Sequence, residues 1–319
     1  AFRSGVNKLA GVIRETLQAQ DLTTVNPSSV INARPINKAL KDFLASSQLS
    51  QLMDQVNPVS ELTQKRKISA VGPGGVKKER ATAEVRDIHY SHYGRICAIE
   101  TPEGQGIGLI NSLATYGRIN EYGFLLSPLK VVDKEKGVVT NEVVYLMADE
   151  EENCCIAQAI EPLTPEGKFV NSRVIVRRKE SVIEVPSSDV DYVDVSPRQL
   201  ISAATALIPF LANDDTSRAL MGSNMQRQAV PLLTTEAPII GTGIEHKIAV
   251  DSGAMVLCKN AGYVSYVSAT EIRVKNDNGT TDSYFLTKFT KTNQDTCINQ
   301  KPAVIKNQRV EQGDVLADG

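Results

Sequence analysis

A segment rich in basic residues and glycine, residues 46–106, carries the side chains best suited to contacting a polyanion. Lysine and arginine neutralise phosphates, while glycines let the backbone approach closely and present its N–H groups. The alternative is a solvated charged face, which is the usual origin of a charge run. The basic residues outnumber nearby acids and flank the turn Gly72–Gly75; they are Lys65, Arg66, Lys67, Lys77, Lys78, Arg80, Arg86 and Arg95.

A second candidate unit spans residues 213–228. Asp214 and Asp215 suit a helix N-terminus, and Arg218 follows one turn later. A guanidinium in this position could bind an anion with two parallel hydrogen bonds. The same spacing also fits an ordinary capped helix in which Arg218 pairs with Asp214 or Asp215. From the residues alone, the capped helix is the favoured interpretation.

Three patterns that resemble catalytic or metal motifs are better explained as structure. His89 and His92 have helical spacing, but no third ligand lies near them in sequence, so we expect no metal site. Residues 104–108 depart from the spacing of a dinucleotide-binding loop and indicate a turn. The acidic run 149–152 indicates a solvated loop between two strands. Without a nucleophile elbow or a Gly-Lys-Ser/Thr phosphate motif, a self-contained active site is not expected.

The basic residues must be positioned by helices in the first third of the chain. Apolar residues recur at helical spacing, and Pro35 suits the first turn of one helix. Asn57-Pro58 is expected to end the helix that begins at Ser46. The predicted helices cover residues 2–17, 35–44, 46–55, 109–118 and 199–211.

From Gly123 onward the pattern changes to β-branched runs separated by turn residues, which predicts a β-rich insert at residues 126–198. An alternating apolar pattern from Ile248 to Leu316 is broken by a hairpin signal, Asp277-Asn278-Gly279. The predicted fold class is α+β: a mixed helical domain, an inserted β-rich domain, and a C-terminal sheet or partial barrel. The predicted strands of the insert cover residues 130–132, 137–145, 170–176 and 182–185.

Composition limits the class of protein. The 319 residues allow two or three domains, and a net charge of −2 confines any nucleic-acid contact to a local patch. No apolar run approaches the roughly 20 residues that span a bilayer, and no signal-like N-terminus is present, so we predict a soluble cytoplasmic protein without a membrane partner. The five cysteines lack zinc or disulfide spacing and are expected to be reduced core thiols; they are Cys97, Cys154, Cys155, Cys258 and Cys297.

Six stretches closely resemble the β subunit of bacterial multisubunit RNA polymerase, in family order and over nearly the whole chain. They are SSQLSQLMDQVNP, KISAVGPGG, EVRDIHYSHYGRICAIETPEG, GLINSLATYGRINEYGF, NDDTSRALMGSNMQRQAVP and NQDTCINQKP. A complete bacterial β subunit is several times longer, so the resemblance implies an internal fragment. It also implies the domains: a fork- or lobe-derived helical region with a nucleic-acid-facing loop (1–125), an external domain (126–198), the fork domain resumed (199–235), and the start of the hybrid-binding region (236–319).

The resemblance implies roles for particular residues. The stretch matching Gly72–Asp87 is a fork loop at the downstream edge of melted DNA. The stretches matching Gln48–Ser69 and Pro102–Ile110 line the path of nascent RNA and form the rifamycin pocket. Arg218 matches a catalytic arginine near the phosphates of the incoming nucleotide. The implied nucleic-acid contacts are Lys65, Arg66, Lys67, Lys77, Lys78, Arg80, Arg86, Pro102, Glu103 and Gln228, and the rifamycin pocket comprises Gln51, Asp54, Gln64, Lys67, Ser69, Glu103 and Ile110.

In this family the catalytic Mg2+ is held by three aspartates of the β′ subunit. No Asp-Phe-Asp-Gly-Asp sequence occurs here, so the chain is expected to hold no cofactor and to be inactive alone. The implied partners are the β′, α, ω and sigma subunits, DNA, RNA and nucleoside triphosphates. An alternative is a structural or interaction module that binds nucleic acid only when assembled with β′.

The chain departs from the family in the drug pocket. Gln64 and Lys67 stand where the family commonly has His and Arg, and Gly106 stands where it commonly has Asn. Lysine cannot reproduce the planar fork of arginine. Rifamycin sensitivity of the parent enzyme therefore does not follow from the resemblance.

Overall fold

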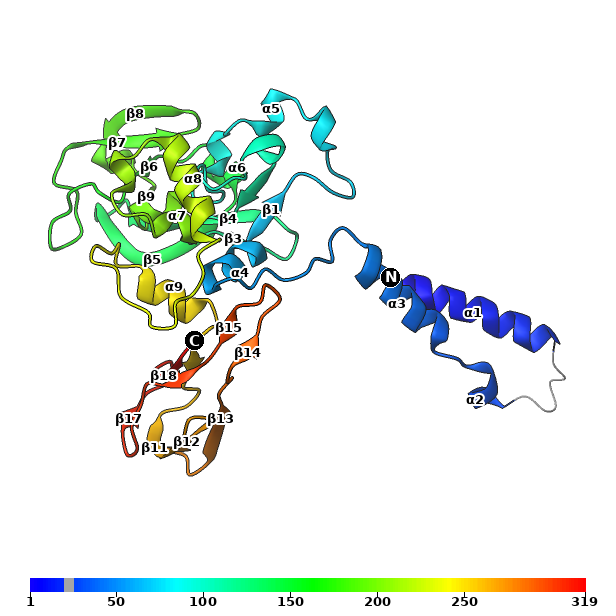
Figure 1. Cartoon of the computed structure of the whole chain (residues 1–319). Coiled ribbons are helices and arrows are strands. Elements are labelled where there is room, and N and C mark those ends of the chain that lie inside the picture. The colour runs from blue at the N-terminus through cyan, green and yellow to red at the C-terminus, as the bar shows by residue number, and fades with distance from the viewer. Residues whose placement is uncertain (20–25) are drawn as a thin grey trace. The chain divides into compact units, whose positions relative to one another are not determined.

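The computed structural model describes residues 1–19 and 26–319, and these residues combine helices with several sheets. This mixed content confirms the α+β class. The chain divides into two compact units, one of Ala1–Leu52 with Gly72–Gly75 and one of Met53–Val71 with Val76–Gly319. Figure 1 labels many of the helices and strands of both units.

The smaller unit is a helical hairpin of α1 (Phe2–Ala19) and α3 (Arg34–Ser46), with the short α2 (Pro27–Val30) between them. Both long helices were predicted, and Pro35 lies in the first turn of α3 as expected. Gly5 allows the two helices to approach closely, because a Cβ at this position would lie 2.8 Å from Ile36 Cα.

The predicted helix at 46–55 is wrong, since α3 ends at Ser46 and irregular backbone follows. Serine hydroxyls compete with helix formation here: Ser47 Oγ accepts from the Leu49 amide, and Ser50 Oγ donates to the Leu44 carbonyl. Asn57-Pro58, expected to end a helix, begins one.

Helix α4 (Pro58–Lys65) begins with a reciprocal cap. The Ser60 amide donates to Asn57 Oδ1 over 2.8 Å, and the Asn57 amide donates to Ser60 Oγ over 3.2 Å. Pro58 occupies the first turn, where its missing N–H costs nothing. The same dipeptide that cannot continue one helix therefore initiates another.

The predicted helix at 109–118 is also wrong. This segment instead supplies β2 (Ile110–Ser112), which pairs antiparallel with β1 (Lys67–Ser69), and β3 (Arg118–Ile119). Leu109, beside β2, is fully buried. Long-range pairing with a distant strand thus overrides the helical spacing of the apolar residues.

A seven-stranded sheet forms mainly from the residues of the predicted insert and confirms strands there, in the order β3-β4-β9-β6-β7-β8 with β5 paired to β4 (Figure 1); its strand β3 precedes the insert. Its core consists mainly of valines, which suit a pleated, half-buried surface. Pairing is antiparallel except between β6 and β9. The bounds are β4 (Leu125–Asp133), β5 (Val138–Leu146), β6 (Ile156–Ala157), β7 (Arg173–Arg178), β8 (Ser181–Pro186) and β9 (Tyr192–Asp194), and α6 (Ala148–Glu151) follows β5.

The helix predicted for 199–211 is much shorter than expected. It is replaced by α7 (Ala203–Ala206), which Ser202 caps by accepting from the Thr205 amide. Phe210 then adopts a left-handed φ of 56°, which a helix cannot continue through. Helix α8 (Thr216–Gln226) follows, with Asp215 as its N-cap as predicted.

Residues after the insert pack against residues before it. Asn57 Nδ2 donates to the carbonyls of Gln226 and Ala229, at 3.0 and 2.8 Å. Asn224 Nδ2 donates to the Thr101 carbonyl over 2.9 Å. These bonds join segments that the inserted sheet separates in sequence.

The C-terminal third forms small sheets, as predicted, after the helix α9 (Glu245–Asp251). The Asp277-Asn278-Gly279 turn joins β12 to β13 and confirms the hairpin. Gly262 is required because a Cβ there would lie 2.8 Å from Asn276 Cα. The strands are β10 (Val256–Leu257), β11 (Gly262–Val267), β12 (Glu271–Asn276), β13 (Thr281–Phe285), β14 (Thr290–Lys291), β15 (Cys297–Ile298), β16 (Lys301–Pro302), β17 (Arg309–Val310) and β18 (Val315–Asp318).

The cysteines do not all belong to the core. All five thiols are free, and Cys97, Cys155 and Cys258 are buried as expected. Cys154 is half-buried and Cys297 is exposed, so the expectation of core thiols is wrong for these two.

Two arginines and two carboxylates form a buried charge network in the larger unit. Arg95 is 3% exposed, and its guanidinium donates to Glu151 Oε2 over 3.0 Å. Arg177 Nη1 lies 3.6 Å from the same oxygen, and Arg177 Nη2 donates to Asp194 Oδ1 over 3.4 Å. The Tyr93 hydroxyl donates to Asp194 Oδ2 over 2.7 Å. Opposite charges balance, which is the condition for burying ions at tolerable cost.

Backbone carbonyls also take part in the network. Arg95 Nε donates to the Leu125 carbonyl over 3.1 Å, and Nη2 donates to the Leu146 carbonyl over 2.8 Å. The Arg177 guanidinium lies 3.7 Å from the centre of the Tyr93 ring, and burial raises the pKa of the Tyr93 hydroxyl, which keeps it a donor. Glu151 belongs to the acidic run predicted as a solvated loop, so that prediction is wrong for this residue.

We expect Glu151→Gln to lower the free energy of unfolding by about 3–5 kcal/mol, because it leaves the buried Arg95 and the partly buried Arg177 short of one negative charge. The matched control is Glu152→Gln, one residue further on, whose carboxylate pairs with Lys179 at the surface; we expect a change below about 1 kcal/mol. Urea unfolding of both variants measures the difference. Equal stabilities would show that the network contributes nothing.

Candidate nucleic-acid interface

The loop after β1 presents basic side chains to solvent. Lys77, Lys78 and Arg80 are exposed, and the last two lie in a single 3-10 turn, Lys78–Arg80. Within residues 1–19 and 26–319, none of the three forms an ion pair with a carboxylate. Their charges are therefore available to an external anion.

The glycine-rich tip before these residues has the conformation that glycine permits. Gly72 and Gly74 adopt φ values of 145° and 82°, which side-chain-bearing residues rarely adopt. The Gly75 amide donates to the Gly72 carbonyl over 3.0 Å, closing the turn. Pro73, Gly74 and Gly75 are exposed, as the predicted loop requires.

Arg86 and Arg66, both predicted nucleic-acid contacts, are bonded to the protein's own backbone. Arg86 Nη1 donates to the carbonyls of Gln105 and Ile107, at 2.8 and 2.7 Å. Arg66 Nη2 donates to the Ala114 carbonyl over 2.6 Å, and burial lowers the pKa of its guanidinium. Both arginines therefore have a structural role in this conformation.

The contact between Arg86 and residues 104–108 depends on Gly108. A Cβ at Gly108 would lie 2.5 Å from the Arg86 carbonyl oxygen, and φ at this glycine is +72°. No other residue allows this approach without moving the backbone. The segment that superficially resembles a dinucleotide loop is thus a turn fitted against Arg86.

A small polar cavity of about 200 Å³ brings together Lys67, Pro102 and Ile110, which the sequence places in the RNA path or drug pocket. The cavity also contains residues that sequence reasoning missed. Glu100 is 3% exposed, and its Oε1 has no hydrogen-bond partner in the described part of the chain. Arg227 Nη2 donates to Asn224 Oδ1 over 2.7 Å, and both residues line the cavity. Glu100 lies inside the stretch EVRDIHYSHYGRICAIETPEG, which resembles the family. That resemblance is the signal that could have identified Glu100 as a site residue.

The remaining predicted pocket residues are placed differently. Ser69 and Glu103 are exposed, and the Asp54 amide donates to Gln64 Oε1 over 2.6 Å. Gln64 therefore supports the backbone at Asp54. Gln51 belongs to the smaller unit, where its side chain donates to the Gln48 carbonyl over 3.4 Å. Lys65 pairs with Glu61 one helical turn away.

Arg218 is exposed on α8 and does not form the predicted internal pair. Its Nη1 contacts Met221 Sδ at 3.4 Å, and no carboxylate of the described chain lies within ion-pair distance. Asp215 instead caps α8 by accepting from the Ser217 amide over 3.1 Å. Gln228, beyond the end of α8, is also exposed.

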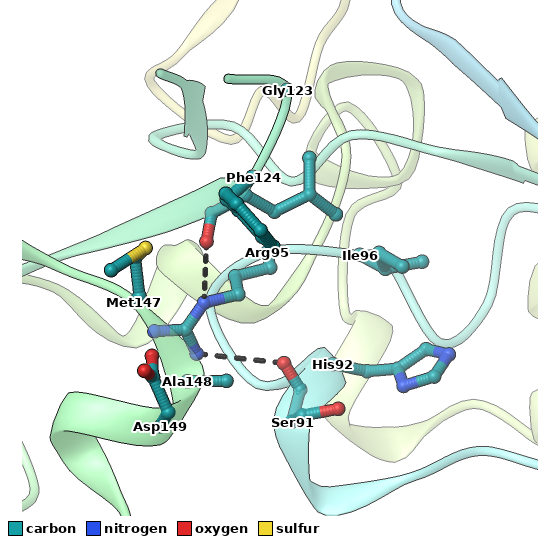
Figure 2. A pocket seen from close by; sticks show the side chains of 10 residues that line it. Ser91, His92, Arg95, Ile96, Gly123, Phe124, Met147, Ala148 and Asp149 are labelled. Carbon is teal, nitrogen blue, oxygen red and sulfur yellow. Dashed lines mark hydrogen bonds between the residues drawn. The ribbon is translucent and has the colours of Figure 1, made fainter. Parts of the chain in front are cut away.

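A wider cavity, about 600 Å³, lies beside the buried network and is lined by Arg95, His92 and Phe124 (Figure 2). The Arg95 guanidinium is held by backbone carbonyls and Glu151, so it is not offered to a ligand. His92 Nδ1 accepts from the His89 amide over 3.3 Å, and burial lowers the pKa of His92. Among the residues that the structure describes, no group of three His, Cys, Asp or Glu side chains could hold a metal ion.

Two family models match the chain and define its class. The one described as RNA polymerase Rpb2, domain 3, matches residues 51–119. The one described as RNA polymerase beta subunit external 1 domain matches residues 129–196, which include most of the seven-stranded sheet. The class is that of multisubunit RNA polymerase subunits. No helix in the described part of the chain is long and apolar enough to cross a membrane.

Curated relatives specify the subunit. The proteins named DNA-directed RNA polymerase subunit beta from Clostridium kluyveri and Clostridium acetobutylicum are 60% and 58% identical over 319 residues, and that of Caldicellulosiruptor bescii is 59% identical over 318 residues. In each case the match covers 100% of this chain and 26% of the relative. The chain belongs to the bacterial RNA polymerase β-subunit family, and it spans about a quarter of the length of these relatives.

We expect Arg86→Ala to loosen the loop at residues 104–108, because the carbonyls of Gln105 and Ile107 in this loop lose their hydrogen-bond donor. The carbonyl of Lys78 loses the same donor. Amide exchange at Ile107 and Leu109 should accelerate about tenfold or more, the scale of losing one or two charge-assisted bonds. Arg86→Lys should rescue only part, since an ammonium lacks the planar fork. Unchanged exchange in Arg86→Ala would mean that the guanidinium serves only external contacts.

Proposed function

We propose that the chain forms part of the nucleotidyl-transferring core of a DNA-dependent RNA polymerase, where it contacts DNA, nascent RNA and the incoming nucleotide. The observation that carries this proposal is a set of exposed cations without a carboxylate partner in the described chain. This set is Lys77, Lys78, Arg80 and Arg218. Such cations suit phosphate contacts, which position a polymerase on its substrates.

We assign the exposed basic loop to DNA at the fork and the polar cavity to the RNA path. Lys67 on the cavity rim would neutralise a phosphate, and Pro102 with Ile110 would contact the sugar or base. Asp54, Gln64, Ser69 and Glu103 would extend the same surface, which matches part of the family's rifamycin pocket. Arg66 and Arg86 would act by fixing nearby backbone, since their guanidiniums are bonded to backbone carbonyls.

The domain boundaries are part of the proposal. A fork domain would comprise residues 1–125 and 199–235, an external domain residues 126–198, and the start of a hybrid-binding region residues 236–319. Support comes from the hydrogen bonds of Asn57 and Asn224, which join the segments on both sides of the insert.

Chemistry would require partner subunits. We propose that β′ aspartates hold the catalytic Mg2+, which neutralises charge on the transferred phosphoryl group when bound. This chain would bind and orient the nucleotide phosphates through Arg218. The other proposed partners are the α, ω and sigma subunits, with a cytoplasmic location.

One observation favours the alternative, an assembly module that binds nucleic acid only with β′. Several cations of the basic segment are already occupied, since Arg66 and Arg86 bond to backbone and Lys65 pairs with Glu61. The isolated chain also has a net charge of −2. Affinity for DNA would then be weak until a second subunit encloses the strand.

A salt titration distinguishes the two functions. We expect the isolated chain to bind a DNA fork with log K falling by about 0.9 per phosphate contact as log salt rises. Replacing Lys77, Lys78 and Arg80 with alanine should reduce the slope by roughly 2–3 units. Lys168→Ala is the matched control, because that exposed lysine pairs with Glu166 and lies outside the predicted nucleic-acid contacts. Binding that appears only after β′ is added would favour the assembly module.

We expect Arg218→Ala in the assembled polymerase to weaken nucleotide addition by about 2–4 kcal/mol of transition-state stabilisation. The reason is that bonds to the phosphates strengthen as charge develops on the leaving group. Arg218→Lys should restore part of the rate. Arg173→Ala, which removes an exposed arginine paired with Glu184, should leave the rate unchanged. Single-nucleotide addition at low and saturating nucleotide tests this; unchanged rates in Arg218→Ala would exclude the role.

A further inference from the structure

The β14–β15 hairpin has a tip with a fixed conformation. Thr292 N–H donates to the Thr296 carbonyl, and Thr296 N–H donates to Thr292 Oγ1, at 2.8 and 3.1 Å. Asp295 adopts a left-handed φ of 67°, which is characteristic of a three-residue hairpin loop. The two other loop residues, Asn293 and Gln294, therefore project their side chains from a rigid turn.

These side chains bond to a segment about 240 residues earlier in the chain. Gln294 Oε1 accepts from the Gln55 amide over 2.7 Å, and Asn293 Nδ2 donates to the Met53 carbonyl over 3.0 Å. Thr296 Oγ1 donates to the Gln55 carbonyl over 3.1 Å. A side-chain amide has an NH2 donor group and a carbonyl acceptor. It can therefore form hydrogen bonds with a backbone segment as a neighbouring β-strand would.

The segment so held has no regular secondary structure of its own. Residues 51–55 form neither helix nor strand. From the other side, the Asp54 amide donates to Gln64 Oε1 over 2.6 Å. The backbone from Met53 to Gln55 is thus fixed between α4 and the hairpin tip, and the position of Asp54 depends on both contacts.

We propose that Asn293, Gln294 and Thr296 position the Met53–Gln55 segment, and so determine how tightly the proposed RNA-facing surface holds the transcript. This inference rests on the proposed function, because it concerns the surface that includes Asp54. The three residues are positioning residues, since they touch the segment and act on RNA through it. No local pattern in the sequence of residues 46–58 reveals them.

The test begins with the chain itself. Asn293→Ala combined with Gln294→Ala should accelerate hydrogen exchange at the Gln55 amide about tenfold, because its acceptor is removed. Asn278→Ala, on the β12–β13 turn, is the matched control: it removes local bonds to Thr280 and should leave exchange at Gln55 unchanged. Unaltered exchange in the double variant would overturn the positioning role.

The second measurement uses the assembled polymerase extending a short RNA primer annealed to template DNA. The double variant should raise KM for the primer about tenfold with kcat nearly unchanged, whereas a general loss of folding would lower the active fraction and kcat. The single variant Gln294→Glu keeps a side-chain oxygen that can accept from the Gln55 amide. Its KM for the primer should therefore lie much closer to the wild-type value than that of the double variant. An unchanged KM in the double variant would contradict the inference.

Lys67→Ala in the same assay separates this inference from the proposed function. Lys67 is exposed on the rim of the polar cavity and is not bonded to the hairpin. A raised primer KM for Lys67→Ala with an unchanged KM for the double variant rejects only the positioning role. An unchanged KM for Lys67→Ala rejects the proposed RNA surface itself.

Discussion

The buried charge network is the constraint on which the larger unit depends. Arg95 precedes the insert in sequence, while Arg177 and Asp194 lie on strands β7 and β9 of the insert and Glu151 ends its helix α6. Removing ions from water costs several kcal/mol for each ion, and only complete partnering offsets that cost. The inserted sheet can therefore settle against Tyr93 and Arg95 in one arrangement, because a shift of one residue in β7 would turn Arg177 to the other face. Such a network contributes more to fixing where the sheet packs than to the total free energy of unfolding.

Two groups of arginines differ in their surroundings. Arg66, Arg86 and Arg95 donate to backbone carbonyls and fix loops in place. Arg80 and Arg218 are exposed without carboxylate partners in the described residues. The first group makes a rigid support, and the second can respond to an external anion. A surface that must contact a polyanion needs both, since flexible cations alone would lose entropy on binding.

Sequence patterns predicted the structure best where one local signal dominated. The β-branched runs gave the strands of the insert, and Pro35 marked the start of α3. Predictions were wrong where distant partners or side-chain bonds decided the outcome, as when Ile110–Ser112 paired with β1. For the site, residue types indicated the basic loop, but Glu100 and Arg227 meet only through tertiary packing. Sequence spacing cannot predict that residues from two separate segments will lie close together.

The hairpin contact has a consequence for the order in which the chain acquires its structure. Met53 and Gln55 leave the ribosome long before Asn293 and Thr296, and their carbonyls lack these donors until the hairpin has been synthesised. At roughly 5–20 residues per second, the delay is on the order of ten seconds or more. During that interval the exposed side chains of Leu49 and Leu52 precede a backbone segment that lacks its bonds to the hairpin. A nascent polypeptide of this sequence therefore passes through a stage in which this region is open to chaperones and proteases.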